Sequence, residues 1–225
     1  MEAIVLAGGF GTRLKEIVKE IPKPMANING KPFLEILLTF LKKRGIKKVV
    51  LSVGYKQQYI INYFKNDFLG LEVIYSKEDE PLKTGGAIKK ALKLTKNENI
   101  FILNGDTFFN VALQDMLKKH IAREGDITVA LKKMYKFSRY GSVVLNKDKI
   151  IKFKEKKYCE EGFINGGIYI IKRDILKNER DIFSFEEYLS NVQKTIYGYK
   201  CDEYFIDIGI PKDYYKAQKD LAKWL

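Results

Sequence analysis

The chain has 225 residues, of which 46% are hydrophobic and 31% charged, so it has the composition of an ordinary globular protein and can bury one large core. No run approaches the roughly 20 apolar residues that cross a bilayer, and residues 1–5 lack a basic leader segment, so we expect a cytoplasmic protein with no membrane partner. The net charge of +13 comes from lysines spread along the chain among Asp and Glu, which argues against a nucleic-acid partner and favours small anionic substrates.

Short apolar strands alternate with amphipathic helices over the first half of the chain. We predict, in order, a strand at 3–6, a helix at 33–44, a strand at 49–53, a helix at 57–64, a strand at 71–75, a helix at 86–94 and a strand at 100–103. This alternation predicts a Rossmann-like α/β fold, with a mixed, mostly parallel sheet flanked by helices. Ligands of such sheets bind beyond the carboxyl ends of the strands.

After residue 123 the pattern changes to closely spaced strands. Strand-like runs lie at 127–132, 141–145, 150–153 and 163–171, and a helix at 211–225 begins with proline in a favoured position. We expect these strands to form a smaller antiparallel lobe, so that one domain, 1–225, has lobes at 1–125 and 126–225. His120 falls among basic residues in an amphipathic helix, and we expect it at the surface.

The strongest chemical signal is a glycine-rich run, Leu6-Ala7-Gly8-Gly9-Phe10-Gly11-Thr12-Arg13-Leu14, followed by Pro22-Lys23-Pro24-Met25. Glycines let backbone N–H groups close on phosphate oxygens that side chains would otherwise block. Arg13 offers a planar fork of donors to phosphate, and Lys23 adds a second positive charge between two prolines. The run lacks the Lys-Ser/Thr pair of a P-loop, so it predicts a phosphate site of another class.

Further motifs follow in a fixed order. They are Leu82-Lys83-Thr84-Gly85-Gly86-Ala87, Asn104-Gly105-Asp106, Tyr140-Gly141, Glu155-Lys156, Asn165-Gly166-Gly167 and Phe205-Ile206-Asp207-Ile208-Gly209. Together with the glycine-rich run, this set resembles the sugar-1-phosphate nucleotidylyltransferases, which share the pattern GGxGTRL followed by PKPM. The resemblance covers most of the chain. It implies an enzyme that transfers a nucleoside monophosphate from a nucleoside triphosphate to a sugar 1-phosphate and releases pyrophosphate.

The resemblance also implies catalytic roles. Arg13 would hold the leaving pyrophosphate and Lys23 the reacting phosphates. Asp106 and Asp207, each of which could otherwise cap a turn, would together bind Mg²⁺, a hard ion that prefers oxygen ligands. The attacking phosphate is already an anion, so the reaction needs positioning and charge neutralisation more than a general base.

Two binding sets follow from the same resemblance. The sugar phosphate would be held by Gly141, Glu155, Lys156 and Asn165 in the lobe at 126–225, with Lys154 and Lys157 as alternatives to Lys156. The nucleotide would be held in the lobe at 1–125 by Leu6, Ala7, Gly8, Gly9, Gly11, Thr12, Arg13, Glu80, Thr84, Gly85 and Asp106.

The base and the sugar are implied less directly. Glu80, with Glu78 as the second choice, suits guanine, because a carboxylate accepts from both N1–H and the exocyclic amine. Similar Glu-Pro-Leu patterns occur in uridylyltransferases of the family, and Lys83 stands where glycine is usual. The short chain, which ends soon after Asp207, most resembles family members that join GTP to D-glycero-α-D-manno-heptose 1-phosphate, giving GDP-heptose for surface polysaccharide.

Other interpretations stay open. Within the family, they are GTP with mannose 1-phosphate and UTP with N-acetylmuramate 1-phosphate. A sugar-nucleotide-binding subunit without activity is a different class, which the presence of Arg13, Lys23, Asp106 and Asp207 disfavours. The resemblance also admits a homodimer, because relatives form dimers or tetramers.

Overall fold

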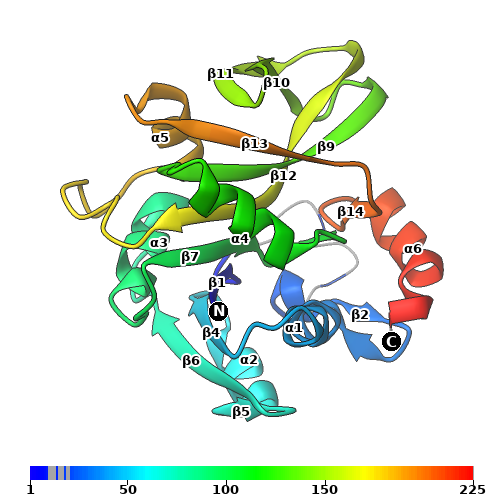
Figure 1. Cartoon of the computed structure of the whole chain (residues 1–225). Helices are drawn as coiled ribbons and strands as arrows, with labels where there is room; N and C mark the ends of the chain where they lie inside the picture. The colour runs from blue at the N-terminus through cyan, green and yellow to red at the C-terminus, as the bar shows by residue number, and fades with distance from the viewer. Residues whose placement is uncertain (10–13, 15–17, 19–20, 225) are drawn as a thin grey trace.

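A ten-stranded mixed sheet runs through the whole protein (Figure 1). The structure is a computed structural model and describes residues 1–9, 14, 18 and 21–224. The strands follow one another across the sheet in the order β10-β11-β13-β9-β12-β7-β1-β4-β6-β5. Their bounds are β1 Glu2–Leu6, β4 Lys48–Val53, β5 Asp67–Phe68, β6 Leu71–Lys77, β7 Asn99–Asn104, β9 Ile127–Phe137, β10 Gly141–Asn146, β11 Lys149–Lys156, β12 Cys159–Lys172 and β13 Ile196–Cys201.

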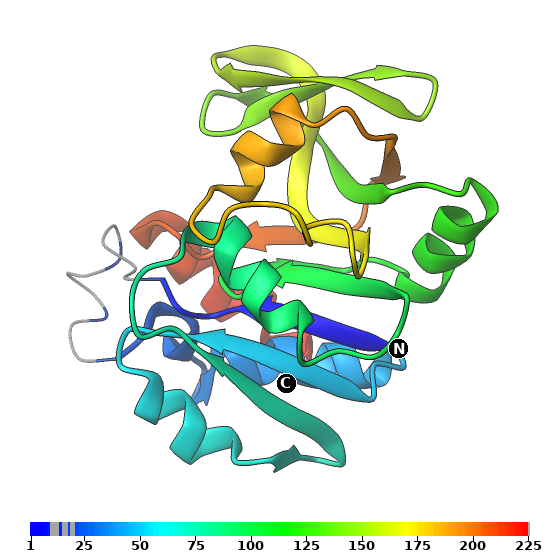
Figure 2. The ribbon, with the colours of Figure 1, turned by 90° about the vertical axis from the view of Figure 1, so that its left-hand side faces the viewer.

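Helices cover both faces of this sheet (Figures 1 and 2). In β1, Ala3 and Val5 pack with the cluster that includes α1, α2, α4 and α6, whereas Ile4 packs with α3 and α5. The parallel strands β7, β1 and β4 are therefore buried on both sides. The helices are α1 Phe33–Lys43, α2 Gln57–Phe64, α3 Lys83–Leu92, α4 Leu113–Ala122, α5 Phe185–Asn191 and α6 Pro211–Asp220.

The second half of the chain extends the same sheet. Strand β12 pairs antiparallel with β7 on one side and with β9 on the other. Strands β10 and β11 form an antiparallel hairpin, and β13 lies parallel to β9. The predicted α/β class and mixed sheet are confirmed, and the antiparallel strands join the main sheet edge to edge. Small two-stranded sheets are formed by β2 (Asn27–Ile28) with β3 (Lys31–Pro32), and by β8 (Thr107–Phe109) with β14 (Phe205–Asp207).

Helix α3 begins at Lys83, three residues before the predicted start at 86. The φ of Lys83 is +58°, in the left-handed region that favours glycine, which explains why glycine is usual at this position in the family. The helix then continues through Gly85 and Gly86, both of which are buried. Glycine is a poor helix former, so the sequence pattern alone placed the helix start too late.

The surface prediction for His120 is wrong, because its side chain is only 2% exposed. It lies on α4 with Leu113 and Met116, at the spacing of one helix face. Its Nδ1 lies 2.8 Å from Thr128 Oγ1 and its Nε2 lies 3.1 Å from Asn99 Oδ1. Burial lowers the pKa of His120 to about 4. Neighbouring lysines suggested an exposed helix face, but the spacing of the apolar residues was the better guide.

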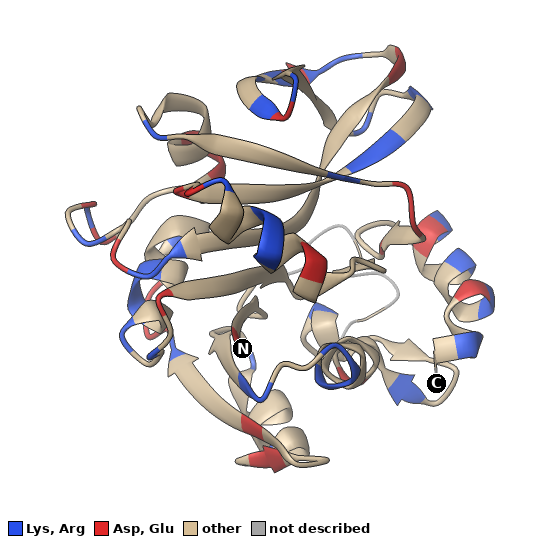
Figure 3. Cartoon of the chain, in the orientation of Figure 1, with Lys and Arg blue, Asp and Glu red and all other residues tan. Residues whose placement is uncertain are grey.

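Lys and Arg are distributed over helices and strands throughout the ribbon and are mixed with Asp and Glu (Figure 3). Across the described part of the chain, none of the helices has the length and apolar character to cross a bilayer.

Candidate active site

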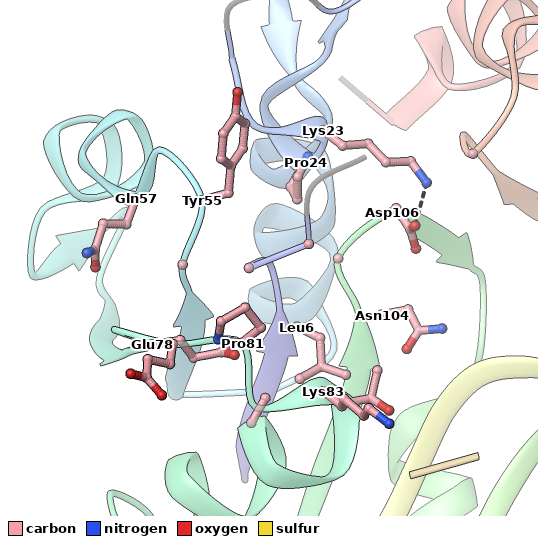
Figure 4. A pocket seen from close by; sticks show the side chains of 18 of the residues that line it. Leu6, Lys23, Pro24, Tyr55, Gln57, Glu78, Pro81, Lys83, Asn104 and Asp106 are labelled. Carbon is pink, nitrogen blue, oxygen red and sulfur yellow. Dashed lines mark hydrogen bonds and ion pairs between the residues drawn. The ribbon is translucent and has the colours of Figure 1, made fainter. Parts of the chain in front are cut away.

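A cavity of about 900 Å³ lies at the carboxyl ends of the parallel strands (Figure 4). Adjacent parallel strands end at the same edge of a sheet, so the loops that follow them come together there. Residues just beyond four strands line the cavity: Gly8 after β1, Gly54 after β4, Glu78 after β6 and Gly105 after β7. The predicted position of the ligand site at this edge therefore coincides with this cavity.

Lys23 and Asp106 form an ion pair at one end of the cavity (Figure 4). Lys23 Nζ lies 2.5 Å from Asp106 Oδ2, and the lysine side chain is only 11% exposed. Lys23 begins a short 3₁₀ helix, η2 (Lys23–Met25), whose buried Pro24 and Met25 anchor it to the core. The ammonium group of Lys23 is therefore held in a fixed position, which suits a group that binds phosphate.

Gly105 sets the position of Asp106. Its N–H donates to the carbonyl of Leu6 at 2.9 Å, and a Cβ at this position would lie 2.5 Å from the same oxygen. Any side chain would push the loop away from β1. The Asn-Gly-Asp order therefore allows the chain to cross the end of β1 and deliver Asp106 to the cavity.

Asp207 arrives beside Asp106 from a distant part of the sequence. Strand β14 pairs antiparallel with β8, which places Asp207 opposite Thr107. The N–H of Gly209 donates to Asp207 Oδ1 at 2.7 Å. A Cβ at Gly209 would lie 2.7 Å from Asp207 Oδ1 and 3.1 Å from Lys23 Nζ. Lys23, Asp106 and Asp207 therefore form one cluster.

Arg139 joins this cluster and was missed in the sequence. Its Nη2 lies 3.0 Å from Asp207 Oδ2, and its Nη1 donates to Asp213 in the first turn of α6. The Tyr140 hydroxyl lies 3.5 Å from Asp207 Oδ2, and burial, together with Asp207, raises the pKa of this tyrosine. The sequence signal was its position directly before the Tyr140-Gly141 motif.

The donor atoms of Asp106 and Asp207 fit a divalent cation. Two carboxylates from adjacent strands offer the hard oxygen ligands that Mg²⁺ prefers. Among the residues that the structure describes, His, Cys, Asp and Glu form no group of three or more suited to a metal ion. The remaining ligands would therefore come from substrate phosphates and water, the usual arrangement for Mg²⁺.

Glu78 and Glu80 both line the cavity, but only Glu78 is held in place. Glu78 Oε1 accepts from the Ser52 hydroxyl at 2.9 Å, and its Oε2 accepts from the N–H of Leu82 at 3.3 Å. Glu80 is exposed. Figure 4 shows Glu78 well apart from Lys23, so a carboxylate and a cation mark different ends of the cavity.

Only some of the other residues predicted to bind the nucleotide line the cavity. Leu6, Gly8, Gly9 and Thr84 line the cavity, whereas Ala7 is buried. Gly85 is buried too, and a Cβ on it would lie 2.3 Å from the ring of Phe183. Gly11, Thr12 and Arg13 lie outside the described residues.

The predicted sugar set lies in the antiparallel half and does not line this cavity. Gly141 on β10 faces Lys156 across the hairpin with β11, and Glu155 and Lys156 are exposed. Asn165 on β12 donates through Nδ2 to the Tyr169 hydroxyl at 2.9 Å. The pairing of β12 with β9 is interrupted just after Asn165, as at a bulge.

Comparisons with known proteins show which proteins this chain is similar to. The D-glycero-α-D-manno-heptose 1-phosphate guanylyltransferase of Aneurinibacillus thermoaerophilus is 51% identical over 100% of both chains. The protein of the same name from Campylobacter jejuni is 52% identical over 96% of this chain and 97% of its own. The crystal structure of HddC from Yersinia pseudotuberculosis, also solved as a complex with GMP-PN, superposes with a TM-score of 0.90 at 36% identity, covering 98% of this chain and 99% of that one.

A family model matches most of the chain, including Lys23, Asp106 and Asp207. It carries the description "Nucleotidyl transferase" and matches residues 2–223. Because that match spans nearly the whole chain, the protein belongs to the nucleotidyl transferase family.

Proposed function

We propose that this enzyme transfers GMP from GTP to D-glycero-α-D-manno-heptose 1-phosphate, with release of pyrophosphate and formation of GDP-heptose for surface polysaccharide. The observation that carries the substrate assignment is the pair of relatives named for this reaction, which are 51% and 52% identical over nearly the whole chain. The cluster of Lys23, Asp106 and Asp207 at one end of the cavity supports the class of reaction, because it brings a cation and two carboxylates together.

The reaction needs no covalent intermediate with the protein. A phosphate oxygen of the sugar 1-phosphate attacks the α-phosphate of GTP in line, and pyrophosphate leaves. In this proposal Lys23 holds the reacting phosphates and Arg13 the leaving pyrophosphate. The ion pair of Lys23 with Asp106 supports this role, because it keeps the lysine pointed at one place before substrate binds.

Nucleotidyl transferases generally use a divalent metal, and we propose Mg²⁺ held by Asp106 and Asp207. When bound, the ion would neutralise charge on the reacting phosphates. Arg139 and Gly209 keep one oxygen each of Asp207 in place, which supports its role as a ligand.

We assign the lobe at 1–125 mainly to the nucleotide and the lobe at 126–225 mainly to the sugar phosphate. The nucleotide set is Leu6, Ala7, Gly8, Gly9, Gly11, Thr12, Arg13, Glu80, Thr84, Gly85 and Asp106, and the sugar set is Gly141, Glu155, Lys156 and Asn165. The fixed carboxylate of Glu78 makes it as strong a candidate for guanine as Glu80. We place the enzyme in the cytoplasm, a reducing compartment that suits the free cysteines Cys159 and Cys201.

Pyrophosphate release with Mg²⁺ tests the proposal. GTP, UTP, CTP, ATP and dTTP would be crossed with the 1-phosphates of manno-heptose, mannose, glucose and N-acetylmuramic acid. We expect turnover with GTP and the heptose phosphate, and a loss of roughly 100-fold or more in Lys23→Met, since one preorganised charge is removed. Lys31→Met is the matched control, because the one ion pair of Lys31 within the described residues is a surface pair with Glu35.

The outcomes separate class from substrate. Turnover confined to GTP and mannose 1-phosphate would keep the mechanism and replace the sugar. Folded protein that turns over no pair would overturn the proposed activity and favour a binding subunit.

A further inference from the structure

Helix α5 brings a carboxylate to the cavity that the sequence motifs did not indicate. Glu186 is the second residue of α5 and lines the cavity together with Thr84. The two residues are 102 positions apart in the sequence. Nothing in the proposed mechanism above uses Glu186.

The segment before α5 is fixed to the first turn of α3. The N–H of Gly85 donates to the carbonyl of Phe183 at 2.9 Å, and that of Gly86 donates to the same oxygen at 3.3 Å. Both contacts need glycine, since a Cβ at Gly86 would lie 2.0 Å from the carbonyl oxygen of Asp181. The glycine pair therefore serves to dock this segment, which places Glu186 at the cavity.

Two hydroxyl groups orient the carboxylate of Glu186. Its Oε2 accepts from Thr84 Oγ1 at 2.7 Å and from Ser184 Oγ at 2.9 Å. The directions are unambiguous, because each hydroxyl has a second partner that can only donate. Thr84 Oγ1 accepts from the N–H of Phe185 at 2.9 Å, and Ser184 Oγ accepts from the N–H of Glu187 at 3.2 Å. Both hydroxyl protons are thus committed to Glu186 Oε2.

The other oxygen is left to accept from a ligand. In the described part of the chain, Oε1 of Glu186 accepts no hydrogen bond, and no Lys, Arg or His pairs with this carboxylate. An ionised carboxylate accepts hydrogen bonds only, and it repels phosphate in the absence of a cation. Its natural ligands are neutral donors, and hydroxyl groups are the donors that remain when guanine is assigned to Glu78 or Glu80.

The position of Glu186 agrees with such a ligand. Lys23 and Asp106 mark the phosphate end of the cavity, and Figure 4 shows Lys83, the residue before Thr84, well apart from them. A hydroxyl-bearing ring next to the phosphates would reach this side. On the basis of the proposed function, we infer that Glu186 Oε1 accepts hydrogen bonds from vicinal hydroxyls of a bound substrate sugar, either the ribose of the nucleotide or the ring of the sugar phosphate.

This assignment also gives Thr84 a role. Its hydroxyl donates to Glu186 and accepts from the backbone of Phe185, so its only proton is already engaged. Thr84 is then a positioning residue that acts on the substrate through Glu186.

Glu186→Gln tests the inference with little structural change. The amide oxygen can still accept from Thr84 and Ser184, while the amide nitrogen replaces the free acceptor Oε1 with a donor. We expect a loss of roughly 10- to 100-fold in binding of the substrate whose hydroxyls it accepts. Glu187→Gln is the matched control, with the same change of charge at the next residue, which does not line the cavity.

Two measurements distinguish the sources of the hydroxyls. Calorimetric titration of GTP, 2′-deoxy-GTP and 3′-deoxy-GTP into the free enzyme reports on the ribose, which is the source if wild type discriminates against a deoxy analogue and Glu186→Gln does not. The KM for the sugar phosphate at saturating GTP reports on the other ring, which is the source if this KM rises roughly 10- to 100-fold with GTP affinity unchanged.

Further variants guard against a trivial loss of folding. Thr84→Val should weaken binding of the same substrate by a smaller factor, and Thr84→Ser, which restores the hydroxyl, should recover most of it. If wild type turns over normally, and Glu186→Gln and Glu187→Gln agree within twofold in both nucleotide affinity and KM for the sugar phosphate, the Glu186 assignment alone is overturned. Failure of wild type to bind GTP or to turn over any substrate pair overturns the proposed function itself.

Discussion

Asp106 and Asp207 lie close together, but different cations hold them. Asp106 pairs with Lys23, which comes from the loop after the glycine-rich run. Asp207 pairs with Arg139, whose guanidinium also reaches Asp213. The protein therefore neutralises each carboxylate from a different part of the chain. Arg139 is the residue best placed to keep Asp207 in a fixed orientation.

Changing Arg139 should impair the metal-dependent step more than the fold. Arg139→Met removes the donor from Asp207 Oδ2, and we expect kcat/KM to fall roughly 10- to 100-fold, the usual effect of losing a group that orients a metal ligand. The Mg²⁺ concentration at half-maximal rate should rise, and binding of Mn²⁺ followed by electron paramagnetic resonance should weaken. Lys216→Met is the control, since within the described residues the one ion pair of Lys216 is a surface pair with Asp220. An unchanged metal dependence in Arg139→Met would contradict this role.

Site residues can be predicted from the sequence where a charged residue stands in a short, distinctive motif. Lys23 between prolines and Asp106 after an Asn-Gly pair could be predicted, and the structure brings them to 2.5 Å. Arg139 and Glu186 were missed. Arg139 directly precedes the Tyr140-Gly141 motif, but its residue type does not show that it pairs with Asp207, 68 residues away, and Glu186 lies outside every motif and 102 residues from Thr84. Contacts of that kind depend on tertiary packing, which residue types alone do not report.

At the scale of elements, local periodicity explains where prediction worked. Helices α1 and α2 were placed to within one residue, because each carries its own apolar face. Helix α5 and strand β13 were not predicted. Helix α5 has only seven residues, and β13 is specified by pairing with β9, far away in the sequence. Strand β13 takes its structure from its surroundings, whereas the local signal for α5 is a single N-cap, Ser184, whose hydroxyl accepts from the N–H of Glu187.

The glycine pair in α3 allows a stability test of one such tertiary contact. In Gly86→Ala the new Cβ would lie 2.0 Å from the Asp181 carbonyl oxygen, so backbone must move. We expect a loss of about 2–3 kcal/mol in the free energy of unfolding, which lowers Tm by roughly 4–10 °C in a chain of this size. Differential scanning calorimetry would measure it. Gly9→Ala is the control, since a Cβ there meets no atom within 4 Å in the part of the chain that the structure describes; equal Tm values for the two variants would contradict the docking role.

At the scale of the whole molecule, buried His120 ties α4 to β9 and β7 through Thr128 and Asn99. Burial, the dominant cause, and the charge of Lys172 lower its pKa to about 4, against the opposing effect of Asp126. Because the unfolded pKa is about 6.5, the unfolded chain binds a proton between these values that the folded chain does not. The free energy of unfolding should therefore fall as pH drops from 6.5 towards 4, by on the order of 3 kcal/mol from this group.

Urea unfolding at a series of pH values would measure this fall in the free energy of unfolding. The chain contains a single histidine, so no other histidine contributes to it. His120→Gln should show a shallower fall in unfolding free energy over the same pH range, whatever its stability at neutral pH. The comparison rests on the slope alone. Equal slopes in variant and wild type would show that other groups set the acid sensitivity.

Strand β12 has a mechanical consequence for the enzyme. Residues 168–172 pair with β7 in the first half of the chain, and residues 159–165 and 169–171 pair with β9 in the second half. A hinge that swung one half against the other would have to break this ladder of backbone hydrogen bonds. The two halves of the sheet should therefore move as one rigid body. Any closure around substrate would involve the segments at the edge of the sheet: the loops that follow the strands, the β10–β11 hairpin and the docked turn that carries Glu186.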